Sequence, residues 1–351
     1  MSYFTAAPKT IYCHRLVLCL TMLAACLPSS VYAENTSGFD DFCAQVDLQK
    51  APDKPVVIRY GLTGGGEEPL ALLWADKKNY SGNGSFYDLQ TQKFTPNDRM
   101  TAVQSDNLDA GSITLPALIT AVRVGIPVRA VASIVETNQI DNQGAFVVLH
   151  KSGITSVKQL KGKRISILGP NTISEYWAKS ALRRAGLKPN DVTYVSIPIP
   201  ANEQALRNAQ IDVAWLARQF LAKAEITGGV DILMRPIQAT QQEHPTTMVF
   251  FTQKFLKEHP KAYCAWRRDY QHALNNWEKD RKAYYPALIA ADYVTTASAK
   301  AGPDGGRALG GKLSIADIDA TIEDMAQAHF LPPGPSVKAA DLIQKGYTLT
   351  R

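Results

Sequence analysis

The sequence lacks the motifs that identify several large classes of enzyme. Its glycine-rich stretch at residues 64–69, GGGEEP, does not end in the lysine and hydroxyl residue of a phosphate-binding loop, and no Gly-x-Ser-x-Gly elbow occurs. The six histidines are scattered without the spacing of metal ligands, at His14, His150, His244, His259, His272 and His329. We therefore expect no catalytic residues, no metal site and no cofactor.

A strong net charge and long apolar runs are absent as well. The formal net charge is +6 over 351 residues, which is too small an excess to indicate a nucleic-acid-binding surface. The longest apolar run near the N-terminus, Leu16–Leu27, spans about 12 residues and is too short to cross a bilayer. No later stretch is long enough. We expect neither a nucleic-acid partner nor a membrane-spanning segment.

The apolar run has the surroundings of an export signal. Lys9 and Arg15 precede it, and Ala33 ends a stretch of small residues after it. This pattern predicts a signal peptide over residues 1–33, cleaved after Ala33. Residues 23–26, LAAC, offer an alternative because they resemble a lipobox, whose cysteine becomes the acylated first residue. The protein is exported in either case, released into the periplasm or anchored as a lipoprotein through Cys26.

Cleavage after Ala33 leaves only two cysteines. It removes Lys9 and Arg15 and no acidic residue, so the formal charge falls by two, from +6 to +4. It also removes three of the five cysteines and leaves Cys43 and Cys264. In an oxidising compartment such a pair is compatible with a disulfide, which would pin the N-terminal segment to a helix near Trp266. The alternative is two unpaired cysteines, one of them buried in that helix.

Strands and helices are expected to alternate after a polar leader at residues 34–55. Val56–Leu62 is β-rich, and glycines and a helix from about Glu68 to Lys78 follow it. A helix is also expected over Asn97–Gln104, and another begins at Pro116, where proline suits the first turn. Further strands are predicted at Phe86–Gln90, Leu108–Ile113, Val128–Val135 and Gly144–His150.

The second half of the chain continues the alternation and ends in helices. A helix over Ser174–Ala185 is predicted to start with a capping box of Thr172 and Glu175 and to end at Gly186. Asn202 can cap the next helix. Strands alternating with helices favour parallel sheets. Later strands are expected at Asp212–Leu216, Val230–Met234 and Thr246–Thr252, and core-facing helices at Lys261–Lys279 and Ser314–Met325.

Residues 154–220 carry an ordered set of short motifs. They are QLKGK at 159–163, GPNT at 169–172, AGLKPNDV at 185–192 and QIDVAW at 210–215. This order resembles the second lobe of the periplasmic substrate-binding proteins of ABC importers, in the group that takes up nitrate, sulfonates, taurine and thiamine precursors. The chain can be followed against that family from roughly Val56 to Phe255.

The resemblance implies an α/β fold of the type II periplasmic binding protein class. Two lobes, each with a parallel-rich sheet flanked by helices, would enclose a ligand cleft and close about the two crossing strands. A length of 351 residues suits two domains. We expect lobe 1 to comprise residues 56–144 and 247–351, lobe 2 to comprise 145–246, and the protein to be a monomer.

In open α/β sheets, ligands bind beyond the carboxyl ends of the strands, where loops lead into helix N-termini. The candidate binding residues in lobe 1 are Thr63, Gly64, Gly65, Glu67, Ser112, Thr114 and Ser133. Those in lobe 2 are Asn171, Thr172, Ser174, Trp215 and Arg218. Purely structural roles are the alternative: a flexible turn for the glycines, and helix capping for residues 171–174.

Four side chains near the expected cleft bear on the ligand's chemistry. Trp215 stands where the family has a tryptophan and would form a flat wall of the cleft, or else lie in the core. Arg218 departs from the family, which often has an acidic residue before proline near this point; its forked donors suit a sulfonate or carboxylate, unless it is an exposed arginine without a ligand. Glu67 and Glu68 are favoured by the dipole of the helix they begin, yet in a closed cleft they would attract an amine.

The expected function is to capture a small organic anion, with a sulfonate favoured, and to deliver it to an ABC permease in the inner membrane. Two alternatives stay open. The ligand can be a thiamine-precursor-like or amine-bearing solute, or the protein can be an exported enzyme or sensory module on the same scaffold. One enzyme branch of the resembled superfamily carries a cysteine-rich run, which is absent here.

Overall fold

Strands and helices alternate along most of the chain, as the sequence predicts. The computed structural model describes residues 42–62, 66–139, 143–296, 299 and 306–348. Its strands are β1 (Val56–Leu62), β2 (Tyr87–Lys93), β3 (Ala110–Thr114), β4 (Val128–Thr137), β5 (Gly144–Leu149), β6 (Arg164–Ile167), β7 (Thr193–Ser196), β8 (Ala214–Ala217), β9 (Val230–Met234) and β10 (His244–Thr252). Its helices are α1 (Glu68–Ala75), α2 (Pro96–Gln104), α3 (Leu115–Arg123), α4 (Ile173–Arg184), α5 (Asn202–Arg207), α6 (Arg218–Thr227), α7 (Pro236–Thr240), α8 (Gln253–Glu258), α9 (Pro260–Lys279), α10 (Arg281–Ala290), α12 (Ile315–Gln327) and α13 (Ala339–Leu342). Within the described ranges, no helix has both the length and the apolarity needed to cross a membrane.

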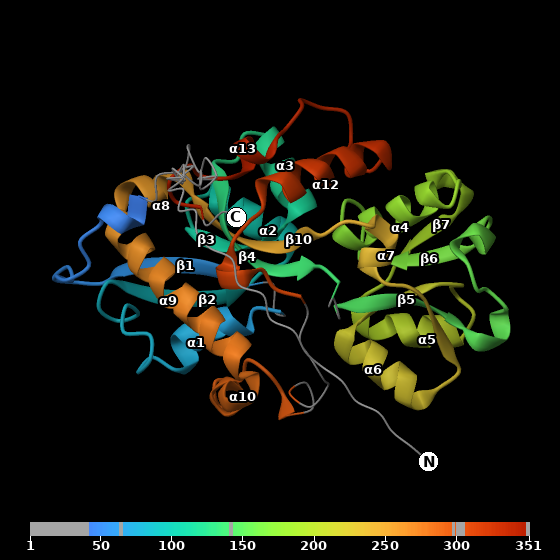
Figure 1. Cartoon of the computed structure of the whole chain (residues 1–351), viewed down its shortest axis with the longest axis horizontal. Helices are drawn as coiled ribbons and strands as arrows, with labels where there is room; N and C mark the ends of the chain where they lie inside the picture. The colour runs from blue at the N-terminus through green and yellow to red at the C-terminus, as the bar shows by residue number, and fades with distance from the viewer. Residues whose placement is uncertain (1–41, 63–65, 140–142, 297–298, 300–305, 349–351) are drawn as a thin grey trace, which may run out of the picture. The chain divides into compact units, whose positions relative to one another are not determined.

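Lobe 1 is built on a five-stranded sheet with the order β2-β1-β3-β10-β4 (Figure 1). β1 runs parallel to β2 and to β3. β10 lies antiparallel to both β3 and β4, so the expectation of a parallel sheet is wrong at this strand. The reason is topological: β10 follows lobe 2 in the chain and re-enters the sheet from the opposite end.

Helices cover both faces of this sheet. The core on one face joins β1 to α1, α9 and α10. The predicted stripe of α9 lies in that core, and its five side chains are fully buried: Tyr263, Trp266, Tyr270, Leu274 and Trp277. The core on the other face includes α2, α3, α12 and α13. There Ile318 and Met325 of α12 are fully buried, while Ile315 and Ile322 are partly buried against the same core.

Lobe 2 contains a three-stranded sheet with the order β8-β5-β9 and a parallel pair, β6 and β7. β5 is antiparallel to both of its neighbours, which again departs from the parallel expectation. Successive side chains of β5 point to opposite faces. Ala145 and Val147 pack with α5 and α6, whereas Phe146 and Val148 pack with α4 and α7. Lobe 2 therefore has helices on both faces as well.

Two helix starts differ from the predictions. Thr172 is the N-cap of α4 but accepts no capping hydrogen bond. Glu175 instead accepts a bond from the backbone N–H of Asn171 at 2.7 Å, so the predicted capping box is wrong because a loop N–H takes its carboxylate. Asn202 is the first residue of α5 and follows the N-cap, Ala201. Its side chain is buried and does not cap the helix.

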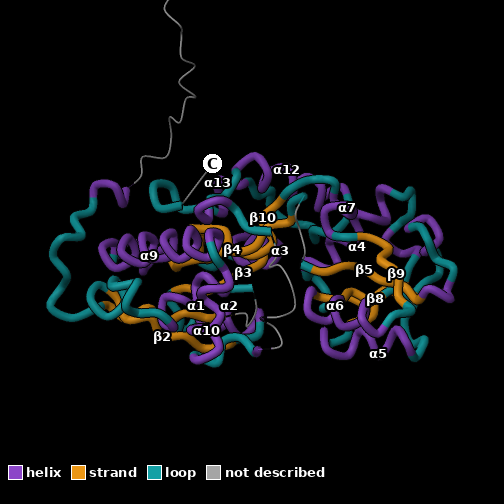
Figure 2. Tube along the Cα trace, turned by 60° about the horizontal axis from the view of Figure 1, so that its bottom comes forward, coloured by secondary structure: helices purple, strands orange, loops and turns teal. Residues whose placement is uncertain are grey.

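The chain crosses between the lobes twice, from β4 to β5 and from β9 through α7 to β10 (Figure 2). Gln143 ties the two crossings together. Its Nε2 donates to the carbonyl of Glu136 at 3.0 Å, to Thr137 Oγ1 at 3.1 Å and to Thr246 Oγ1 at 3.2 Å. One amide therefore joins the end of β4 to the start of β10. The expected lobe boundaries at 144/145 and 246/247 fall beside this contact and stay a prediction.

A disulfide joins Cys43 to Cys264 of α9, so the bridged alternative is the one that the structure contains. It attaches the short 3-10 helix Phe42–Gln45 to lobe 1. The ring of Phe42 also stacks on Tyr347, with centroids 4.7 Å apart. Both ends of the described chain are therefore fastened beside α9.

His244 at the start of β10 is fully buried and anchors the second crossing. Trp177 Nε1 of α4 donates to His244 Nε2 at 3.1 Å. Because Nε2 accepts, Nδ1 carries the proton and donates to the carbonyl of Gln242 at 3.1 Å. Burial lowers the pKa of His244 to about 4, although the Gln242 carbonyl favours the protonated ring. The imidazole is therefore neutral in the folded protein at pH 7.

We predict that this histidine makes the protein less stable in acid. Histidine in an unfolded chain has a pKa of about 6.5, so below that pH the unfolded chain binds a proton that the folded chain does not. His244 should lower the free energy of unfolding by about 3 kcal/mol as the pH falls from 7 to 4. Urea unfolding of the wild type and His244→Gln at both pH values measures this. The variant should lose correspondingly less stability in acid; equal losses would contradict the prediction.

Candidate functional site

Four helices begin at the carboxyl ends of strands in positions expected to face a ligand. α1 and α3 follow β1 and β3 in lobe 1, and α4 and α6 follow β6 and β8 in lobe 2. None of these four helices has a side-chain cap hydrogen bond. α5 and α9 lack such a bond too, whereas Thr95 caps α2 and Ser314 caps α12. Helix starts without side-chain caps direct backbone N–H groups outward, where they can bind an anion.

In lobe 1 the structure brings Glu67 and Ser112 together. Ser112 Oγ donates to Glu67 Oε1 and lies 2.9 Å from the hydroxyl of Tyr60, which is left to donate to it. All three residues are fully buried. Burial raises the pKa of Tyr60 well above its usual value, and the nearby Glu67 charge raises it further. Thr63, Gly64 and Gly65 lie outside the described residues.

Two buried arginines hold this end of lobe 1 in place. Arg99 donates to the carbonyls of Ser112, Leu62 at 3.1 Å and Phe94 at 3.2 Å. These bonds link the ends of β1 and β3 to the segment before α2. Burial lowers the pKa of Arg99, opposed by the charge of Glu67. The charge of Glu67 therefore favours the protonated form of this guanidinium.

Arg307 makes the second such connection. Its Nη1 donates to the carbonyls of Gly66 at 2.9 Å and Ile134 at 2.6 Å, and its Nη2 donates to Glu68 at 2.8 Å. The side chain is only 2% exposed. Arg307 thus joins the loop after β1 to β4 and pairs with one of the two carboxylates expected to attract an amine. Glu67, Glu68, Arg99 and Arg307 together carry no formal net charge.

The other two lobe 1 candidates differ in environment. Thr114 ends β3 and is half-buried. Ser133 of β4 is buried, and within the described residues its hydroxyl has no hydrogen-bond partner. Its carbonyl accepts a bond from the hydroxyl of Tyr270 at 2.9 Å. Within the described residues, the Ser133 hydroxyl is therefore an unused polar atom in the middle of β4, an edge strand of the sheet.

In lobe 2 the loop before α4 is organised by its own side chains. Thr172 Oγ1 donates to the carbonyl of Gly169 at 2.6 Å, and Ser174 Oγ accepts from the backbone N–H of Leu168 at 2.9 Å. Ser174 is fully buried, whereas Asn171 is exposed. The backbone of Asn171 is left-handed, with φ of 60°. The side chains of Thr172 and Ser174 thus order this loop without capping α4, and Asn171 is exposed.

Trp215 and Arg218 lie at the end of β8. Trp215 is 4% exposed and packs between Phe146 and Trp177, at ring centroid distances of 5.1 and 4.9 Å. Of the two alternatives for this residue, its packing is that of the core. Arg218 is half-buried at the first position of α6. Its backbone N–H donates to the carbonyl of Gln143 at 2.8 Å, which places the start of α6 at the first crossing.

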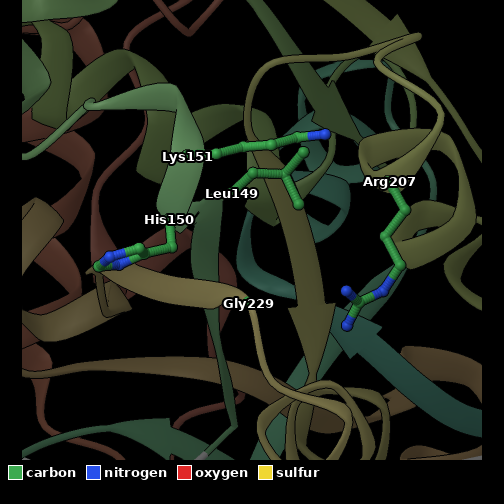
Figure 3. A pocket seen from close by; sticks show the side chains of 5 residues that line it. All are labelled: Leu149, His150, Lys151, Arg207 and Gly229. Carbon is green, nitrogen blue, oxygen red and sulfur yellow. The ribbon is translucent and has the colours of Figure 1, made fainter.

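Two cavities of the described structure lie away from these residues. One of about 370 Å³ is lined by Leu149, His150, Lys151, Arg207 and Gly229; Figure 3 shows Leu149 and Lys151 on one side of it and Arg207 on the other. The second, of about 270 Å³, lies between α4 and α12. Neither is lined by a predicted binding residue. Among the described residues, no group of three His, Cys, Asp or Glu side chains could hold a metal ion.

Comparisons with known proteins point to a single family. A family model described as NMT1/THI5 like matches residues 88–277. The taurine-binding periplasmic protein of Escherichia coli strain K12 is 27% identical over 203 residues, which are 57% of this chain and 60% of that protein. The chain thus aligns with less than two thirds of that relative's length.

Solved structures share the fold at lower identity. The periplasmic aliphatic sulphonate binding protein SsuA from Escherichia coli matches 85% of this chain and 94% of its own, with a TM-score of 0.66 and 17% identity. The alkanesulfonate-binding protein SsuA from Xanthomonas axonopodis pv. citri, bound to MOPS, matches 84% and 99%, with a TM-score of 0.66 and 16% identity. The two-lobed periplasmic binding protein fold is therefore confirmed.

We predict that Arg307 is required for the stability of this end of lobe 1. Arg307→Ala leaves the carboxylate of Glu68 and two carbonyls without that donor, and loss of one partner of a buried ion pair costs about 3–5 kcal/mol. Adding Glu68→Gln should recover part of that loss, because it removes the uncompensated charge. Chemical denaturation measures both variants, with Arg123→Ala as the control, since Arg123 donates to the carbonyl of Pro332 at the surface. A loss no larger than that of the control would contradict this role.

Proposed function

The chain belongs to the NMT1/THI5-like family, and on that basis we propose that it is an exported solute-binding protein. It captures a small organic anion, with a sulfonate favoured, between its two lobes and delivers it to an ABC importer. The observation that carries this proposal is the set of four helix starts without side-chain caps, two from each lobe, at the carboxyl ends of β1, β3, β6 and β8.

The two lobes contribute differently to binding. Lobe 1 supplies a rigid, uncharged half of the site, because Arg99 and Arg307 fix its loops and offset Glu67 and Glu68. Its ligand-binding groups are the loop at residues 63–65, Glu67, Ser112, Thr114 and Ser133. This half supplies hydrogen bonds and shape, so the sign of the ligand's charge is decided by lobe 2.

Lobe 2 supplies the positive potential. The starts of α4 and α6 offer backbone N–H groups, and the guanidinium of Arg218 adds two forked donors that suit a sulfonate or carboxylate. Asn171, Thr172 and Ser174 order the first of these loops, and Trp215 supports the second from the core. Closure of the lobes about the two crossings then surrounds the anion.

Capture and delivery involve no bond making or breaking. The protein acts as a monomer, and its partners are the small-molecule ligand and an ABC permease in the inner membrane. Export uses residues 1–33 as a signal peptide cleaved after Ala33, which places the mature protein in the periplasm.

A panel of matched compounds tests the proposed function. Ethanesulfonate, taurine and ethanolamine share a two-carbon skeleton and differ in carrying a sulfonate, both groups or an amine; nitrate and thiamine extend the panel. We expect ethanesulfonate and taurine to raise the melting temperature, since a ligand at 100 times its Kd stabilises by about 2.7 kcal/mol, and ethanolamine to have no effect. Stabilisation by ethanolamine instead of ethanesulfonate would indicate the amine-bearing alternative, and no response to any compound would contradict the proposal.

Arg218 is the side chain predicted to sense the anion. Arg218→Ala should weaken binding of the stabilising sulfonate by about 1.5–3 kcal/mol, the range for a hydrogen bond to a charged group. Isothermal titration calorimetry measures the change. Lys223→Ala is the matched control, because it removes one positive charge from an exposed position of the same helix. If the two variants bind equally well, Arg218 is not part of the site.

A further inference from the structure

Asp324 of α12 receives an unusual number of hydrogen bonds for one carboxylate. Its Oδ2 accepts from the hydroxyl of Tyr176 at 2.9 Å and from Ser180 Oγ. Its Oδ1 accepts from Arg183 and from Arg184 at 2.7 Å. Asp324 is only 5% exposed. All four donors come from α4, and we call these five residues the Asp324 latch.

Along the described part of the chain, the lobes are connected at the two crossings, and the latch joins them a third time. α4 belongs to lobe 2, where it packs against α7 and β6. α12 follows β10 in the chain and packs against β10 and α13 of lobe 1; the views show it reaching toward lobe 2 (Figures 1 and 2). The rings of Tyr176 and Phe330 add an apolar contact beside it, with centroids 5.7 Å apart. The latch is therefore a non-covalent connection between the lobes.

The latch also lies close to the second crossing. Gln242, just before β10, places its Nε2 3.4 Å from the hydroxyl of Tyr176 and 3.4 Å from Thr321 Oγ1 of α12. Arg184 donates to the carbonyls of Ala239 at 3.2 Å and Thr240, which end α7. A contact beside the hinge moves little when the lobes open or close. It can therefore persist in both states.

The chemistry of the latch makes it a strong contact, and its loss should affect the connection between the lobes and not the fold of either lobe. Hydrogen bonds between guanidinium groups and a carboxylate are about twice as strong as neutral ones. Removing the carboxylate leaves Arg183 and Arg184 facing each other without it. The cavity of about 270 Å³ that borders the latch is lined by both arginines and Gln242, so water can reach these groups. Loss of the latch should therefore loosen the lobes without unfolding either of them.

We propose that Asp324 is a positioning residue for ligand capture, which holds α12 of lobe 1 to α4 of lobe 2 and restricts the lobes to a hinge motion. Two crossings alone allow the lobes to twist as well as to open. A third connection beside them removes the twist and keeps the binding loops of the two lobes opposite one another. This inference rests on the proposed function, because it assigns the latch a role in closure on a ligand.

The test measures the distance between the lobes in the exported protein. Spin labels are attached through keto amino acids introduced at the exposed positions Val124 in lobe 1 and Ile226 in lobe 2, which are 68% and 89% exposed. This chemistry leaves the disulfide intact. Asp324→Asn should broaden the distance distribution without ligand and weaken ethanesulfonate binding by about 5- to 50-fold. Glu323→Gln, which changes an exposed carboxylate on the same helix, should do neither.

Two results would overturn the proposed role of the latch. One is a folded Asp324→Asn protein whose ligand-free distance distribution equals that of the wild type. If Asp324→Asn does not fold, the milder double variant Tyr176→Phe and Ser180→Ala is measured instead, since it removes two neutral donors and keeps the charges. An unchanged distance distribution in that variant is the second result that would overturn the proposed role of the latch. Failure of the proposed function would be seen differently. The wild type would then bind no compound of the panel, while the distances measured without ligand would still show whether the latch restricts the lobes.

Discussion

The antiparallel insertion of β10 between β3 and β4 is the constraint on which the rest of the structure depends. It returns the chain from lobe 2 into the sheet that β1 to β4 began. The segments after β10 can therefore cover both faces of that sheet, with α9 on one and α12 on the other. The insertion also places Thr246 beside Thr137, where Gln143 joins the crossings, and Gln242 beside α4 and α12. A hinge, its cross-link and the Asp324 latch all follow from one strand pairing.

Charge is distributed unequally over the two halves of the proposed site. In lobe 1, acidic and basic side chains lie buried together and offset one another, and the two arginines donate to the backbone carbonyls of Leu62, Gly66 and Ile134. Such an arrangement is rigid, because each buried donor would lose a partner if a loop moved. In lobe 2, backbone N–H groups and one guanidinium lie at the starts of α4 and α6. A rigid neutral half that supplies hydrogen bonds and a half with positive potential are together suited to a small anion.

Local patterns in the sequence were sufficient to predict the strands and helices, but not to predict which residues distant in the chain they contact. β1 is found at the predicted residues, and the apolar stripe of α9 is buried as predicted. Both depend on the spacing of side chains along the chain, two residues in a strand and 3.6 in a helix, which nearby residues determine. The direction of β10 and the roles of Arg99, Arg307 and Asp324 depend on residues far away in the chain: Arg307 lies 239 positions from Glu68. The predicted capping box at Thr172 has the right spacing, but it is wrong because the carboxylate of Glu175 accepts a hydrogen bond from the backbone N–H of Asn171 in the preceding loop. Trp215 could not be assigned from sequence, since a buried and a cleft-lining tryptophan give the same pattern in a strand.

The central claim is that one small anion is held between the helix starts of both lobes. A crystal structure of the protein with ethanesulfonate or taurine tests it most directly. The account predicts electron density for the sulfonate between the starts of α1 and α3 on one side and those of α4 and α6 on the other, within hydrogen-bonding distance of Arg218. Density in the cavity beside Lys151 and Arg207 instead, or contacts to one lobe alone, would contradict it.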